Sequence, residues 1–209
     1  MYYRLIYVLA LPLYILLTVT SCTSCGDSRR KSGTINPLVQ QLDETPDTAE
    51  LVTLNSITND SIYVLSHTRR RNEAFAYSEA QANGMVYGTL KEGDRYSIYA
   101  QGRTKTVNIA INVTELEGRW IYNQAEFRGI DFNNRGGMSS INTGDICFRE
   151  WKLLNGRLYI YYVDAQTVAD NRHKYEVEEA YIQLFNHDHL VLLFKGQTYD
   201  CQKYIKRKL

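Results

Sequence analysis

The sequence has little of what the easily recognised functional classes require. Its 24 lysine and arginine residues nearly balance its 23 aspartate and glutamate residues, so no excess charge predicts a nucleic-acid partner or a bound cation. No Gly-x-Ser-x-Gly elbow, phosphate-binding loop or paired-carboxylate motif occurs, which argues modestly against an enzyme. We therefore expect neither a cofactor nor a metal. Only 3 prolines occur against 17 tyrosines, and this composition favours an all-β chain.

Long apolar runs are scarce too, and the one near the start of the chain is short. It covers Leu5–Val19 and is interrupted by Pro12, Tyr14 and Thr18. About 20 apolar residues are needed to span a bilayer, so this run is typical of a secretory signal that follows a positive charge, here Arg4. An uncleaved anchor helix and a plain secretory signal are the alternatives.

The residues that end this run, Val19-Thr20-Ser21-Cys22, resemble the lipobox of bacterial lipoproteins. The resemblance implies a signal peptide over residues 1–21, cleavage before Cys22, and lipid attachment to that cysteine. Cys25 is the alternative, in a poorer cleavage context. A lipid anchor implies a membrane partner and a place in the bacterial cell envelope. No acidic cluster of the kind linked with surface export in Bacteroidetes-type lipoproteins follows Cys22, which favours the outer membrane, facing the periplasm.

Two further cysteines, Cys147 and Cys201, lie far from the anchor region. An oxidising compartment permits a disulfide between them, but the sequence does not show that they lie within bonding distance. Two buried reduced thiols are the alternative. They do not form a Cys-x-x-Cys pair, so a zinc or redox site has no support.

The remaining chain divides into a polar tether at residues 22–47, a small β-domain at 48–113 and a larger β-domain at 114–209. The small domain has five strand-like stretches bounded by turn residues, with a short helix predicted over Asn72–Asn83 from its Glu, Ala and Gln content. The five stretches are Glu50–Ile57, Ser61–His67, Gly84–Leu90, Arg95–Gln101 and Lys105–Val113. Five short strands and one helix favour a small closed barrel of the OB type.

The larger domain has eight strand-like runs, and Asn155-Gly156 is a strong hairpin signal between two of them. The runs are Arg119–Asn123, Glu126–Phe132, Gly137–Ile141, Ile146–Leu154, Arg157–Asp164, Lys174–Phe185, His189–Phe194 and Thr198–Tyr204. Short local connections between antiparallel strands predict an up-and-down barrel, whose interior can hold one small ligand.

The start of this pattern, Leu116-Glu117-Gly118-Arg119-Trp120, resembles the Gly-x-Trp opening of lipocalins, in particular the short lipocalin-like lipoproteins of Bacteroidetes. The resemblance covers about residues 116–204. It implies that Gly118 and Trp120 plug the closed end of the barrel, with a basic side chain, Lys203 or Lys206, near the tryptophan ring. The family's usual arginine is not matched.

A second resemblance concerns Gly84–Asp94, whose glycine pattern is similar to a hairpin of small OB-type domains. An OB domain beside a lipocalin-like barrel is the domain pair of the NlpE envelope-stress lipoproteins. The domain order here is reversed and that family's Cys-x-x-Cys is absent, so its copper-linked role is not implied. The predicted helix also follows the second strand, whereas in the OB fold it follows the third.

The leading functional hypothesis is non-catalytic binding of a small apolar or amphipathic ligand inside the barrel. Strand alternation would place Cys147, Arg149, Trp151 and Leu153 on one face of their strand. We expect Trp151, Tyr159 and Tyr161 to line the ligand site, with core filling as the alternative.

The rival hypothesis is an envelope interaction or stress-sensing module whose barrel is filled by its own side chains. His187-Asp188-His189 is interpreted as a solvated turn rather than a metal site. Two loops, Asn133–Gly137 and Ala165–Arg172, are the first places to look for a binding surface.

Overall fold

The computed structural model describes residues 41–42, 44–100, 105–164 and 175–205. These residues all belong to one compact unit, Ser32–Leu209. The predicted signal peptide, Cys22, most of the tether and the Ala165–Arg172 loop lie outside the described residues. Within the described ranges, no helix has the length and apolar character needed to cross a membrane.

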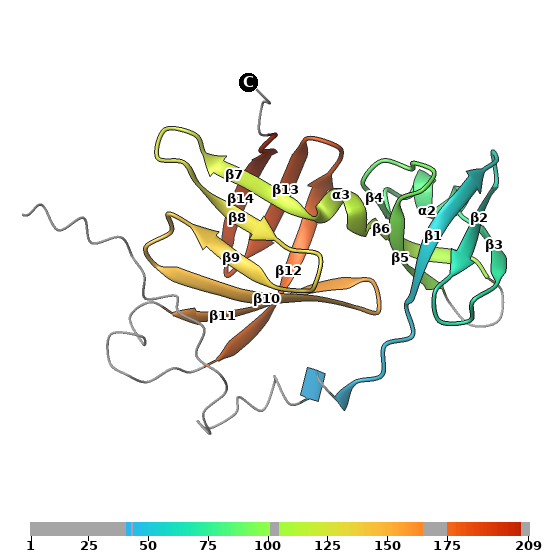
Figure 1. Ribbon diagram of the computed structural model, residues 1–209, viewed down its shortest axis with the longest axis horizontal. Helices are drawn as coiled ribbons and strands as arrows, with labels where there is room; N and C mark the ends of the chain where they lie inside the picture. The colour runs from blue at the N-terminus through green and yellow to red at the C-terminus, as the bar shows by residue number, and fades with distance from the viewer. Residues whose placement is uncertain (1–40, 43, 101–104, 165–174, 206–209) are drawn as a thin grey trace, which may run out of the picture. The chain divides into compact units, whose positions relative to one another are not determined.

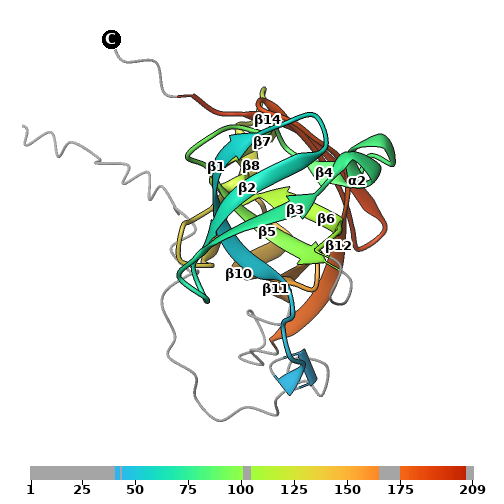
Figure 2. The same cartoon turned by 90° about the vertical axis from the view of Figure 1, so that its right-hand side faces the viewer.

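The first sheet has six strands in the order β3-β2-β1-β5-β6-β4 (Figure 1). Its elements are β1 (Glu50–Ile57), β2 (Ser61–Ser66), β3 (Asn72–Ala76), α2 (Ser78–Ala82), β4 (Val86–Tyr87), β5 (Arg95–Ala100) and β6 (Val107–Asn112). Strands β1, β2 and β3 form an antiparallel meander and lie side by side in Figure 2. A parallel bridge from Ala76 to Thr106 brings the end of the edge strand β3 to the start of β6.

The helix predicted over Asn72–Asn83 is wrong in its first half, because residues 72–76 form β3. Glu73 and Phe75 are buried there, while the residues between them are exposed, and this period of two is that of a strand. Pairing with β2 therefore overrides the helical propensity of the segment. The short helix α2 follows β3, and the sheet has six strands instead of the five predicted, with β4 and β6 parallel.

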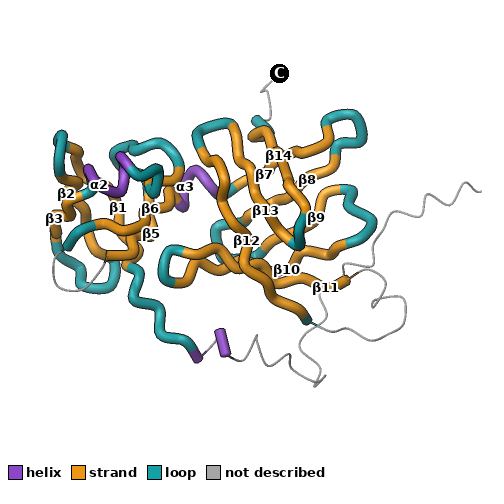
Figure 3. Tube along the Cα trace, turned by 180° about the vertical axis from the view of Figure 1, so that it is seen from behind, coloured by secondary structure: helices purple, strands orange, loops and turns teal. Residues whose placement is uncertain are grey.

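The second sheet has eight strands in the order β10-β11-β12-β13-β14-β7-β8-β9, and all paired neighbours are antiparallel. Its strands are β7 (Gly118–Asn123), β8 (Arg128–Phe132), β9 (Met138–Ile141), β10 (Ile146–Leu154), β11 (Arg157–Asp164), β12 (Glu176–Phe185), β13 (His189–Phe194) and β14 (Gln197–Lys203). A bridge from Gly137 to Glu150 joins the two edges, so the barrel is nearly closed. The predicted all-β fold with an eight-stranded antiparallel barrel is confirmed; strands dominate the trace in Figure 3.

Two local features set the geometry of β10 and β11. Asn155 and Gly156 both have positive φ, 51° and 77°, as a two-residue hairpin turn requires, so this predicted hairpin is confirmed. A β-bulge between Phe148 and Glu150 interrupts the alternation predicted for β10. Phe148 and Trp151 consequently pack in the same core, although a regular strand would place them on opposite faces.

The helix α3 (Val113–Leu116) connects the two sheets. The Asn112 side chain caps it by accepting a hydrogen bond from the Glu115 backbone N–H at 2.9 Å. Its buried residues Val113 and Leu116 belong to the core of the barrel, which fixes how the chain enters β7.

Candidate functional site

Side chains from the described strands pack against one another in the interior of the barrel. Its core contains Trp120, Phe132, Phe148, Trp151, Leu158, Ile160, Tyr162, Leu190, Leu192, Phe194 and Tyr199, all buried. Their rings contact one another edge to face or tilted, with centroids 5.4 Å apart for Tyr162 and Phe194 and 5.8 Å apart for Phe132 and Trp151. A ligand that entered between these rings would have to displace them.

Trp120, on β7, is fully buried in the barrel core. Its indole N–H donates a hydrogen bond to the Leu116 carbonyl at 2.7 Å, and the Lys203 ammonium lies 4.4 Å from the ring centroid. Lys203 also donates to the Glu115 and Glu117 carbonyls, while its burial lowers its pKa. Gly118 has φ +111° and lies beside Lys203, so only glycine fits there without strain.

A polar cluster lies on β11 and its neighbours, toward the other end. The Lys195 ammonium lies 4.3 Å from the Tyr162 ring centroid and donates to the Tyr162 hydroxyl at 3.0 Å. That hydroxyl donates to Glu176 at 2.8 Å. Burial, followed by the Glu176 carboxylate, raises the pKa of Tyr162, so this hydroxyl stays protonated and keeps the cluster connected.

The three residues predicted to line the ligand site do not meet in one cavity. Trp151 lies in the barrel core, and its indole N–H donates to the Asn133 carbonyl at 3.1 Å. Tyr159 and Tyr161 pack instead with Leu42 and Val177 in a separate cluster. Because Leu158, Ile160 and Tyr162 face the barrel core, the two intervening tyrosines face outward. Their predicted place inside the barrel is therefore corrected to its outer wall.

The two core cysteines are not joined. Cys147 and Cys201 are both buried thiols, in agreement with the alternative to a disulfide. Burial, reinforced by Asp200, raises the pKa of the Cys201 thiol to about 12, so this cysteine is a poor nucleophile.

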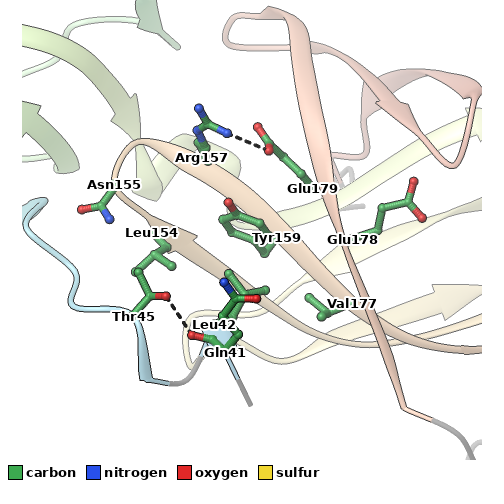
Figure 4. Close-up of a pocket in the computed structure, with 10 residues that line it drawn as sticks. All are labelled: Gln41, Leu42, Thr45, Leu154, Asn155, Arg157, Tyr159, Val177, Glu178 and Glu179. Carbon is green, nitrogen blue, oxygen red and sulfur yellow. Dashed lines mark hydrogen bonds and ion pairs between the residues drawn. The ribbon is translucent and has the colours of Figure 1, made fainter. Parts of the chain in front are cut away.

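The outer wall of the barrel carries a groove of about 600 Å³ (Figure 4). Leu42, Leu154, Tyr159 and Val177 form its apolar cluster. The other lining residues are Gln41, Thr45, Asn155, Arg157, Glu178 and Glu179. Arg157 and Glu179 form an ion pair at 3.1 Å on one side of Tyr159, and the Glu178 side chain points away from that ring.

A strap, defined as residues 41–48 without the undescribed residue 43, covers one side of the groove. Asn155, at the tip of the β10–β11 hairpin, holds it: the Asn155 side-chain oxygen accepts hydrogen bonds from the Thr48 backbone N–H and hydroxyl, both at 2.8 Å. The Asn155 amide donates to the Pro46 carbonyl at 3.2 Å, and its backbone N–H donates to Asp47 at 3.1 Å. The β10–β11 turn thus holds one wall of the groove in place.

The other sequence candidates have structural partners. His187 contacts Glu115 at 3.1 Å and His189 contacts Asp200 at 2.7 Å, so the two histidines hold different carboxylates. Among the residues that the structure describes, no three metal-ligating side chains cluster. Asn133 accepts backbone hydrogen bonds from Arg135 and Gly137, which orders the Asn133–Gly137 turn.

The sequence did not reveal the groove because Leu42 lies in the predicted tether and Val177 carries no motif. A weak signal was present in β11, where both strand faces are apolar or aromatic between Leu158 and Val163. Such a strand needs cover on both sides, and the strap supplies it on the outer one.

A comparison with protein-family models agrees with the barrel. Residues 112–207 match a family model described as lipocalin-like. A solved structure of a lipocalin-like protein from Bacteroides thetaiotaomicron VPI-5482 is 21% identical, with a TM-score of 0.36; the match covers 42% of this chain and 95% of that one. No curated protein matches.

Proposed function

Since residues 112–207 are lipocalin-like, we propose that this chain is a non-catalytic binding protein, held at the bacterial outer membrane by lipid on Cys22, that takes a small amphipathic ligand. The groove on the outer wall of the barrel is the proposed site, and its volume of about 600 Å³ is the observation that carries the proposal. Small-molecule sites commonly have volumes of roughly 300–1,000 Å³.

The chemistry of the groove favours a ligand with an apolar body and a polar end. Tyr159 is only partly buried and offers apolar surface, whose burial contributes about 25 cal/mol per Å² before ordering costs, while Leu42 and Val177 are already buried beneath it. The Arg157–Glu179 pair at the rim offers charged hydrogen-bonding groups that would orient a polar end. The barrel core is a less favourable site, because a ligand there would have to displace aromatic side chains that pack against one another.

The groove predicts a specific effect of Tyr159. We expect the Tyr159→Ala variant to bind the amphipathic dye 8-anilinonaphthalene-1-sulfonate about tenfold more weakly than the wild type, because it loses the central ring of the groove. Fluorescence titration measures this. Tyr181→Ala is the matched control: Tyr181 lies on β12 but is 56% exposed and does not line the groove. Equal losses in the two variants would refute the assignment. Native mass spectrometry of protein from its own host would then identify a retained ligand.

The anchor predicts that Cys22 decides where the protein is found. In the Cys22→Ser variant we expect loss of the lipid-modified N-terminal peptide in mass spectrometry and release of the protein from the membrane fraction. Cys25→Ser is the control and should stay attached. If Cys22→Ser remains as tightly membrane-bound as the wild type, the lipid anchor is the wrong explanation and the apolar segment itself must hold the chain.

A second function, an interaction module with a packed barrel, is favoured by a different observation. Tyr181 and Leu184 on β12 are 56% and 42% exposed, which is high for large apolar side chains. If Tyr159→Ala leaves dye binding unchanged, this face of β12 becomes the better candidate.

A further inference from the structure

We propose that the six-stranded sheet docks on an anionic membrane surface through its arginine hairpin, which we define as residues 67–71 between β2 and β3. The proposal rests on the charge and the apolar neighbours of this hairpin. It does not depend on the groove or on the lipid at Cys22.

A buried carboxylate gathers cations at the base of the arginine hairpin. The Glu73 side chain has no exposed surface, yet its carboxylate forms ion pairs with three cations. These are Arg71 at 2.7 Å, Arg69 at 3.0 Å and Lys105 at 3.3 Å. Burial alone would raise the pKa of Glu73, but the hydrogen bonds from these three cations lower it to about 2. Glu73 is therefore ionised under ordinary conditions and holds the cations in place.

The positive charges around Glu73 outnumber the carboxylates that pair with them. Arg69, Arg71 and Lys105 keep 51%, 63% and 47% of their side-chain surface exposed, so their charged ends also face water. Glu50 supplies a second carboxylate, 3.4 Å from Arg69. Arg70 is exposed, has φ +53°, and makes no ion pair with any residue in the described ranges. Four cations thus stand against two carboxylates, and the excess positive charge lies at the tip of a sheet.

Large apolar side chains lie next to this charge. Leu65, which directly precedes the end of β2, is 41% exposed, and Leu51 on the neighbouring strand β1 is 39% exposed. Leu65 pairs with Thr53, so Leu51 is its diagonal neighbour on the outer face of the sheet. Tyr63, two residues before Leu65 on the same face, is 45% exposed.

Positive charge beside exposed leucine and tyrosine side chains fits a bilayer with anionic headgroups. The guanidinium groups would meet the phosphates, while the apolar side chains would enter the interface between headgroups and acyl chains. A free phosphate would satisfy the guanidinium groups but would leave Leu51 and Leu65 in water. The overall charge of the chain is only +1, so the attraction is local to the arginine hairpin.

The test uses the full chain reconstituted into vesicles of phosphatidylglycerol or of phosphatidylcholine, with hydrogen exchange measured over residues 61–72. We expect exchange to be about fivefold slower on the anionic vesicles at low salt, and this protection to fade as salt screens the charges. Arg70→Glu should abolish the protection without affecting the fold, because the Arg70 side chain makes no ion pair in the described structure. Lys91→Glu is the control, an equal charge reversal at an exposed site of the same sheet domain.

Three outcomes would overturn the proposal. The first is equal exchange on the two kinds of vesicle. The second is protection that Lys91→Glu removes as fully as Arg70→Glu. The third uses neutral vesicles to which soluble glycerol phosphate or a short single-stranded oligonucleotide is added. If either additive slows exchange as much as anionic lipid does, the arginine hairpin binds a free phosphate or a nucleic acid instead.

Discussion

Replacement of Trp120 by alanine is expected to lower the free energy of unfolding of the barrel by about 3–5 kcal/mol. Trp120 has no exposed surface, its ring centroid lies 5.9 Å from that of Phe185, and its indole N–H holds the Leu116 carbonyl. The alanine variant would create a cavity in the barrel core and leave that buried carbonyl without its donor. Denaturant unfolding followed by tyrosine fluorescence and circular dichroism measures the change.

Two further variants separate packing from charge at this site. Lys203→Met keeps much of the side-chain volume but removes the ammonium, which lies above the Trp120 ring and donates to the Glu115 and Glu117 carbonyls, so we expect a smaller loss of about 1–3 kcal/mol. Tyr181→Ala, at an exposed position, should change stability by less than about 0.5 kcal/mol. If Trp120→Ala unfolds at the same denaturant concentration as Tyr181→Ala, Trp120 does not plug the barrel.

The sequence predicted the barrel well because its signals are local. Asn155-Gly156 marks a tight hairpin wherever it occurs between strands, and alternation along β13 shows which residues are buried. The first sheet was predicted less well, because residues 72–76 have helix-favouring composition and become a strand only through pairing with β2. Helix and strand propensities reflect only residues that are close in the sequence, so they do not include the strand with which a segment will pair.

The candidate site was harder to predict because it depends on which way side chains point. A single bulge after Phe148 brings Trp151 into the same core as Phe148, and no residue in β10 signals it. The groove depends on Leu42, which reaches β11 and β12 from more than a hundred residues away in the sequence. Both faces of β11 are apolar or aromatic, but this pattern does not say which segment covers the outer face.

Glu73→Gln is expected to destabilise the six-stranded sheet by about 3–5 kcal/mol, comparable to the Trp120 variant. The amide has nearly the same shape as the carboxylate, yet it leaves Arg69, Arg71 and Lys105 facing one another without the buried charge that holds them. Glu79→Gln, at an exposed position in α2, is the control and should be nearly neutral. Hydrogen exchange across β2 and β3 localises the effect to this sheet, and an unchanged exchange pattern would contradict the buried-charge explanation.

The same carboxylate should make the sheet sensitive to acid. Its pKa is lowered from 4.5 to about 2 in the folded protein, so the unfolded chain binds the proton more readily. The contribution of Glu73 is therefore complete above about pH 4.5 and is lost as the pH falls toward 2. Stability of the wild-type sheet should decline through this window more steeply than that of Glu73→Gln, whose amide does not titrate. If stability falls with pH equally in the wild type and in Glu73→Gln, Glu73 is not the group that holds the cations. The arrangement of the arginine hairpin would then need another explanation.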